Sequence, residues 1–294
     1  MLATLGKTAA RALVQRVRGG QSAHAGTLVT PGPELRRTFA PLDSNLLDQY
    51  IAHVGGDPRA YRGVVPPHFF PHWAMPLGAD ALAGLPYPIL RVLNAGCRMQ
   101  VNALMPRNEA LHVRAQLANV DDDGKRALIT TRVITGTDSA PDALHVEIYA
   151  FVPLSSDKPR SANGQPAAAP KRDKPRVPQG CREIAFGKLP ADAGLSFAKL
   201  TGDFNPIHWV PLWARAAGFP APILHGFATL ARAFEALVSA RLGGDPGRLR
   251  AIDVRFVKPL VLPARVVVCA SDEGSVWVGD APGGAAYLEG TIEG

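Results

Sequence analysis

The chain of 294 residues is predicted to be an α+β protein made of two similar halves. A segment at 155–180 is rich in Pro, Lys, Ser and Ala, has almost no large apolar side chain, and so has the composition of a linker. After it, one long helical pattern is followed by several strand patterns, which indicates a sheet wrapped around a helix. Short motifs before the linker recur after it, which is typical of a duplication.

The first half, 1–154, has its strongest strand patterns at 127–135 and 144–152. Its first residues, about 1–25, interleave basic with small and apolar side chains. A short solvated helix or a frayed arm is the favoured interpretation, over a transit peptide or a segment that touches a membrane surface. No apolar run approaches the roughly 20 residues that span a bilayer, so no stable membrane insertion is expected.

The second half, 181–294, contains two helix signals. Asn205 can cap a helix whose first position is Pro206, and Gly218 predicts its end near Ala217. A longer helix is expected to begin near Gly226 and to end at the glycine pair 243–244. Its apolar face is formed by Phe227, Leu230, Phe234, Leu237 and Val238. Strands are expected at 251–258, 265–270, 276–278 and 287–292.

The two halves resemble each other at one fixed offset. Residues 98–106 begin with Arg and end with Pro, as do residues 255–263, and at the same offset 67–69 lies opposite 224–226. Few identities are involved, so the duplication is predicted to be degenerate.

Composition narrows the classes of protein and of partner. The net charge of +7 is dispersed and occurs without a recognition-helix motif, so nucleic acid is not an expected partner, whereas acidic thioester substrates are. The three cysteines, Cys97, Cys181 and Cys269, are far apart in sequence and odd in number, which argues against a disulfide scaffold and a structural zinc site. A reducing cytoplasm fits best.

The strongest functional signal is the stretch 202–208 followed by His225 and Gly226. Asp203 and His208 can share acid and base roles through one water, and Asn205 can hold that water or the substrate. The backbone N–H of Gly226, at a helix start, can stabilise an oxyanion. Each residue also has a structural alternative: a solvated carboxylate, a common Asn-Pro turn, a surface histidine and a helix boundary.

Together these residues resemble a known family. Residues 197–208, 214–219 and 222–226 closely resemble the hydratase 2 motif of the MaoC-like (R)-specific enoyl-CoA hydratases and 3-hydroxyacyl-thioester dehydratases. The resemblance implies a double hot-dog fold, in which each half wraps a long helix in an antiparallel sheet. It also implies reversible hydration of trans-2-enoyl thioesters to (R)-3-hydroxyacyl thioesters, on CoA or an acyl carrier protein, with no metal or redox cofactor.

The resemblance implies that Asp203 and His208 form the catalytic dyad, the pair that shares the acid and base roles. It assigns a supporting role beside this dyad to Asn205 and the oxyanion hole to Gly226. We expect Gly202, His225 and Phe227 to contact the substrate. A homodimer of double hot dogs is compatible with the sequence but is not required by it.

The first half departs from this motif. Asp57 is followed by His68 only eleven positions later, against twenty-two between Asp203 and His225, and no Asn-Pro-x-His lies between them. One active site per chain is therefore predicted. In the family, loss of that segment makes room for a bulky acyl tail, so medium to long chains are favoured. His68 and His72 lie among Pro, Phe and Trp and are interpreted as packing residues.

Two other functions are compatible with parts of the sequence. A hot-dog thioesterase needs a carboxylate on the long helix facing the thioester, and Glu235 is in that helix, but it is interpreted as a solvent-side charge. A non-catalytic subunit that binds acyl thioesters is the second alternative, and it would be expected if the dyad were broken.

Overall fold

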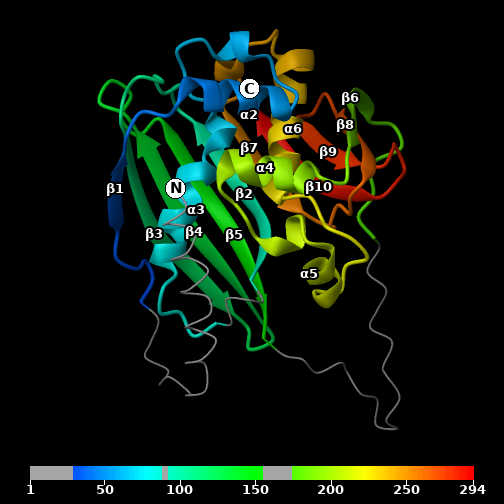
Figure 1. The fold of residues 1–294 in the computed structure, drawn as a ribbon, viewed down its shortest axis with the longest axis horizontal. Helices are drawn as coiled ribbons and strands as arrows, with labels where there is room; N and C mark the ends of the chain where they lie inside the picture. Colours follow the sequence, from blue (N-terminus) through cyan, green and yellow to red (C-terminus); the bar gives the residue numbers. More distant parts are fainter. Residues whose placement is uncertain (1–28, 88–91, 155–173) are drawn as a thin grey trace.

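The computed structural model describes residues 29–87, 92–154 and 174–294 (Figure 1). The predicted basic arm at 1–25 and residues 155–173 of the predicted linker lie outside the described residues. Within the described ranges, no helix is long and apolar enough to cross a membrane.

A single antiparallel sheet runs through both halves, in the order β1-β3-β4-β5-β2-β7-β10-β9-β8-β6. The strands of the first half are β1 (Leu35–Phe39), β2 (Leu93–Val101), β3 (Leu111–Asp122), β4 (Arg126–Gly136) and β5 (Leu144–Pro153). Those of the second half are β6 (Arg182–Leu189), β7 (Ala251–Phe256), β8 (Ala264–Ala270), β9 (Ser275–Gly279) and β10 (Ala286–Glu293). All four strand patterns predicted in the second half are present, as are the two predicted in the first.

The order of the strands has an internal two-fold symmetry. The sequence β1-β3-β4-β5-β2 is repeated in reverse by their counterparts in the second half, and the halves join where β2 pairs with β7. In this pairing Cys97 lies opposite Val254, its own counterpart at the offset of 157 positions that relates Arg98 to Arg255. The duplication predicted from the sequence therefore coincides with the register of the sheet.

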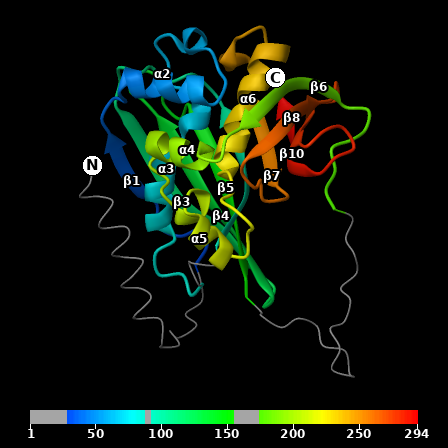
Figure 2. The ribbon, with the colours of Figure 1, turned by 45° about the vertical axis from the view of Figure 1, so that its right-hand side comes forward.

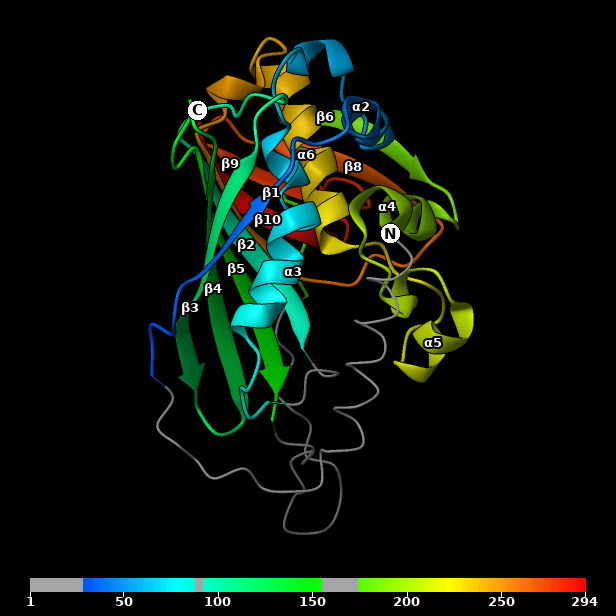
Figure 3. The same ribbon diagram turned by 60° about the vertical axis from the view of Figure 1, so that its left-hand side comes forward.

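Helices form a second layer on one face of this sheet (Figure 3). The α-helices are α2 (Ser44–His53), α3 (Pro71–Ala81), α4 (Ala193–Thr201), α5 (Pro211–Ala216) and α6 (Gly226–Arg241). Single-turn 3₁₀ helices are η1 (Pro58–Tyr61), η2 (Pro67–Phe69), η4 (Pro206–His208) and η5 (Pro246–Arg248). The helices α2 and α4, one from each half, contact each other (Figure 2).

Helix α6 is the centre of the core. Its bounds match the prediction, and all five residues of its predicted apolar face are at most 3% exposed. The helix ends as expected, with Gly243 and Gly244 at positive φ angles of 66° and 81°. Its counterpart α3 is shorter, at 11 residues, and contains Pro76.

The predicted single helix from Pro206 to Ala217 is wrong in one respect, because the structure divides it in two. The 3₁₀ turn η4 ends at His208, Val210 is extended, and α5 begins at Pro211. Proline has no N–H for the helical bond to the carbonyl four residues back, and it disfavours a helical conformation in the residue before it. The end near Ala217 is confirmed, with Gly218 at a φ of 90°.

The segment that was interpreted as a linker is packed at its end. Val177 is 1% exposed, and its N–H and C=O bond to Gly284 and Gly283. The sequence could not indicate this, because one valine among prolines and basic residues has no periodicity.

Candidate active site

The loop that follows α4 begins at a left-handed glycine. Gly202 has a φ of 85° and donates its N–H to the carbonyl of Ala198 at 2.8 Å, which closes the last turn of the helix. A residue with a Cβ is strained in this conformation, so glycine is suited to turn the chain toward Asp203. This turn directs the predicted motif out of the helix.

Two short hydrogen-bonded turns then hold the polar side chains. The Oδ1 of Asp203 accepts from the N–H of Asn205 at 3.3 Å, and the Oδ1 of Asn205 accepts from the N–H of Ile207 at 3.3 Å. Asn205 thus caps η4, as predicted, and its exposed side chain is committed to the cap through its oxygen. The carboxylate of Asp203 keeps Oδ2 free of these turns.

His208 is oriented by one backbone bond. Its Nδ1–H donates to the carbonyl of Ile223 at 2.8 Å, which leaves Nε2 as the nitrogen that can accept or deliver a proton. Burial lowers the pKa of His208 below its usual value of 6.5, although the charge of Asp203 opposes this shift. The imidazole is therefore neutral near pH 7.

His225 lies directly under this ring. The two imidazoles stack with their centroids 3.6 Å apart, and His225 donates Nε2–H to the carbonyl of Asp203 at 3.0 Å. Burial, and next the neighbouring His208, lower the pKa of His225 to about 4, so it stays neutral and fixes the backbone of Asp203. It is 2% exposed, and its Nδ1 has no hydrogen-bond partner among the described residues.

The carboxylate and the two imidazoles converge on a small space. One oxygen or nitrogen of each of Asp203, His208 and His225 lies within 4.8 Å of the others. A water that makes hydrogen bonds of about 2.8 Å can bridge groups at this separation. A metal fits less well, because lone pairs of stacked imidazoles lie in their own near-parallel ring planes and do not meet at one point.

Gly226 begins α6 beside this space. As the first residue of the helix it has no acceptor within the helix for its N–H, which can therefore face a ligand. A Cβ at this position would lie 2.5 Å from the ring of Phe256, so any other residue fits only if that ring or the helix start moves. Phe227, in contrast, is 3% exposed and packs on Phe70 and Phe256, which places it in the core.

Gly226→Ala is expected to lower the rate of enoyl-thioester hydration about 100-fold, because a displaced helix start no longer aims its N–H at the oxyanion. The added methyl must displace either the ring of Phe256, which is held by Phe227, or the helix start itself. Steady-state kinetics of the variant measure the effect. The double variant Gly226→Ala with Phe256→Leu should recover part of the rate. Wild-type activity in the single variant would contradict the predicted displacement of the helix start, since alanine keeps the backbone N–H.

The interpretation of Glu235 as a solvent-side charge is wrong. Glu235 is 3% exposed, and its Oε1 accepts from the hydroxyl of Tyr61 and contacts Nε2 of His68, each at 2.7 Å. The hydroxyl of Tyr50 in turn donates to the carbonyl of His68 at 2.9 Å. We call Tyr50, Tyr61, His68 and Glu235 the buried polar cluster.

This cluster occupies the place of a second active site. His68 is the counterpart of His225, but no residue in the position of His208 accompanies it in the described part of the first half. Asp57 is exposed and pairs with Arg59 instead, and hydrogen bonds from Arg59 lower the pKa of that carboxyl. The sequence signal for a buried Glu235 was the largely apolar composition of residues 226–241, because a helix that is apolar nearly all round is buried.

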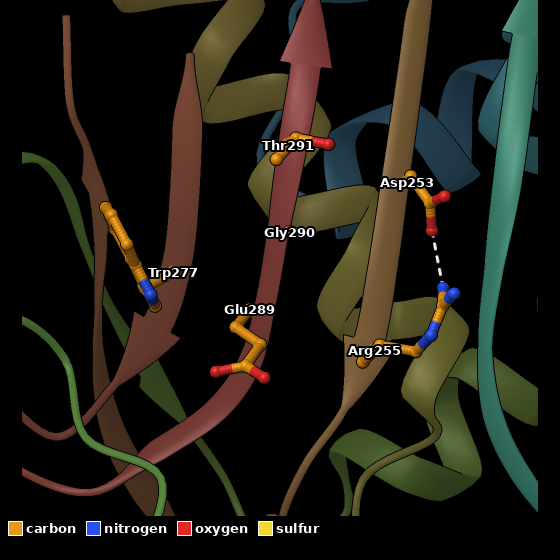
Figure 4. A pocket seen from close by; sticks show the side chains of 6 residues that line it. All are labelled: Asp253, Arg255, Trp277, Glu289, Gly290 and Thr291. Atoms are coloured by element: carbon orange, nitrogen blue, oxygen red, sulfur yellow. Dashed lines mark hydrogen bonds and ion pairs between the residues drawn. The ribbon is translucent and has the colours of Figure 1, made fainter. Parts of the chain in front are cut away.

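A shallow depression lies on the opposite face of the sheet (Figure 4). Asp253, Arg255, Trp277, Glu289, Gly290 and Thr291 line it, from strands β7, β9 and β10. It contains none of the predicted site residues.

Comparison with known proteins agrees with this architecture. Residues 167–284 match the family described as MaoC like domain. Enoyl-CoA hydratase ChsH3 of Mycobacterium tuberculosis is 32% identical over 178 residues, which cover 59% of this chain and 58% of that protein. 3-Hydroxyacyl-thioester dehydratase Y of the same bacterium is 31% identical over 191 residues, which cover 62% of each protein.

The match extends further in structure than in sequence. The crystal structure of HtdX of Mycobacterium tuberculosis superposes with a TM-score of 0.67 and 21% identity, over 89% of this chain and 100% of that one. The chain therefore has the double hot-dog fold that the motif predicted. By sequence, it spans about three fifths of the length of the curated relatives it matches.

Proposed function

We propose that the protein catalyses the reversible hydration of trans-2-enoyl thioesters to (R)-3-hydroxyacyl thioesters. The observation that carries this proposal is the convergence of Asp203 and His208 within 4.8 Å beside the free helix start at Gly226. The similarity to an enoyl-CoA hydratase and a 3-hydroxyacyl-thioester dehydratase supports the same reaction.

In the proposed reaction, the water is held between the carboxylate of Asp203 and Nε2 of His208. Its hydroxyl bonds to the β-carbon, while its proton passes to the dyad. The electrons of the double bond move toward the thioester oxygen, where the N–H of Gly226 and the start of α6 stabilise the enolate. The dyad then returns a proton to the α-carbon, so atoms and charges balance without a metal or redox cofactor.

The substrate carrier, the chain length and the assembly belong to the same proposal. The net charge of +7 favours an acidic carrier, CoA or acyl carrier protein. The first half has lost the α5 segment and the dyad, which supports one active site per chain, with medium to long acyl chains preferred. The medium is expected to be the cytoplasm, and a homodimer is compatible with the fold.

The thioesterase alternative is weaker than the sequence suggested. Its carboxylate would be Glu235, which is already bonded to Tyr61 and His68 and is closed off from solvent. A carboxylate in this state cannot reach a thioester carbonyl without breaking two hydrogen bonds.

A direct assay tests the proposal. Loss of the conjugated enoyl-thioester absorbance is followed with crotonyl-CoA and with a trans-2-enoyl-CoA of ten or more carbons, and the product is analysed on a chiral column. We expect the (R)-3-hydroxyacyl product, with the longer substrate preferred. No turnover of any chain length contradicts the function, an (S) product contradicts the stereochemistry, and release of free CoA identifies a thioesterase.

The kcat/KM for hydration is expected to fall at acid pH, with the midpoint of the fall below pH 6.5. The pKa of His208 is lowered by burial, so its Nε2 remains unprotonated until the pH falls below the usual histidine range. Below pH 6.5, His208 is protonated more readily in the unfolded chain than in the folded one. The free energy of unfolding therefore also falls as the pH falls. The pH profile of kcat/KM, corrected by residual activity at pH 7 after each incubation, measures the midpoint; a midpoint above 6.5 contradicts the prediction.

A further inference from the structure

The first half sends one side chain to the base of the active-site loop. His72, the second residue of α3, places its Nδ1 3.2 Å from the carbonyl oxygen of Thr201. Thr201 is the last residue of α4 and lies two positions before Asp203. A residue interpreted from sequence as packing therefore contacts the backbone that leads into the proposed dyad.

The chemistry of this contact fixes the tautomer of His72. A carbonyl oxygen can only accept, so Nδ1 carries the proton and donates it. Burial lowers the pKa of His72, and the imidazole is therefore neutral near pH 7. Its ring is also held in orientation, because it stacks on Phe69 with centroids 4.9 Å apart and planes 13° from parallel.

The peptide unit between Thr201 and Gly202 is thereby held from both sides. Its C=O accepts from His72, and its N–H donates to Ala198 at 2.8 Å. The orientation of this peptide plane sets φ of Gly202, and glycine has no Cβ to restrict that angle by itself. Carbonyls at a helix end have no partner within the helix, so without His72 the plane would depend on water for its acceptor contact.

We propose that His72 is a positioning residue for Asp203. It acts across the interface between the halves by fixing the peptide from which the catalytic loop departs. On the other side of the loop, His225 bonds the carbonyl of Asp203 itself at 3.0 Å, so one histidine from each half holds the backbone around the carboxylate. The degenerate half thus contributes to the geometry of the only proposed site. This inference rests on the proposed hydratase function.

Three variants separate this role from packing. His72→Phe keeps a ring to stack on Phe69 but has no donor. His72→Asn restores a donor at the position of Nδ1. The control, His145→Phe, alters a half-buried histidine of β5 on the other face of the sheet. We expect His72→Phe to lower kcat about tenfold with KM for crotonyl-CoA changed less than about twofold, because the position of a catalytic group affects the chemical step more than binding. His72→Asn should recover most of the loss, and His145→Phe should behave as wild type.

A second measurement does not depend on activity. Hydrogen–deuterium exchange of peptides covering 202–208 should be faster in His72→Phe than in wild type, with exchange in β7 and α6 unchanged. Unchanged exchange in the loop, unchanged kcat in His72→Phe, or equal loss in the Asn and Phe variants overturns the proposal. If the wild-type protein hydrates no enoyl thioester, the proposed function fails, while the exchange result still decides whether His72 holds the loop.

Discussion

Asp203→Asn and His208→Asn are each expected to lower kcat for hydration by about 1,000-fold or more, since each removes one of two groups that hold and activate the same water. Asn at 203 keeps an oxygen that can accept from the N–H of Asn205. Asn at 208 keeps a donor for the carbonyl of Ile223, where Nδ1 now lies at 2.8 Å, but puts nothing at the place of Nε2. Both changes therefore remove chemistry while leaving the local bonds of the fold.

The double variant sharpens this expectation. Groups that act as a unit are strongly non-additive, so the double variant should be little slower than the slower single one. Stopped enoyl-CoA assays at high enzyme concentration measure all three, with circular dichroism to verify folding. If both single variants retain more than a tenth of the activity, the dyad is not the catalytic machinery, and if their losses multiply, the two residues do not share one water.

The local features of the site could be predicted because they depend on a short stretch of chain. Asn205 caps its turn and Gly202 adopts a left-handed conformation for reasons that the sequence itself provides. Six of the ten strands in the described residues and the ends of α6 were predicted for the same reason. The break at Pro211 could also have been found, because proline and the residue before it both disfavour a continuous helix.

The contacts between the halves could not be predicted. Glu235 meets Tyr61 and His68 across a sequence separation of more than 160 residues, and His72 meets Thr201 across 129. Periodicity places a residue on a face of its own helix but does not say what covers that face. Glu235 was therefore interpreted as exposed, although residues 227–231 and 233–238 of its helix are buried.

The first half has a role in the structure beyond the one predicted from its sequence. By sequence it was a degenerate copy whose missing segment leaves room for a substrate tail. In the structure, Tyr50, Tyr61 and His68 are fully buried at the position equivalent to the active site, and Glu235 of the other half completes their hydrogen bonds. The buried polar cluster thus joins the halves through helix α6, which also bears Gly226.

Glu235→Ala is expected to lower the free energy of unfolding by about 2–4 kcal/mol. It removes the acceptor of Tyr61 and the partner of His68, and both groups are fully buried, so water cannot replace the carboxylate without entering the core. Burial raises the pKa of Tyr61 far above its usual value, so its hydroxyl stays a donor that needs an acceptor. The midpoint of urea unfolding, followed by circular dichroism, measures the loss.

Two matched variants separate the hydrogen bonds from general effects of losing a glutamate. Glu235→Gln retains an oxygen that can accept from Tyr61 and should cost less than Glu235→Ala, because the buried donor keeps its partner. Glu183→Ala changes an exposed glutamate of the edge strand β6 and should remain within about 0.5 kcal/mol of wild type. If Glu235→Ala unfolds at the same urea concentration as Glu183→Ala, the buried polar cluster does not stabilise the junction of the halves. If Glu235→Gln is as unstable as Glu235→Ala, an acceptor oxygen for Tyr61 does not by itself account for the stabilisation, because glutamine keeps that oxygen and replaces the other with an NH2 group.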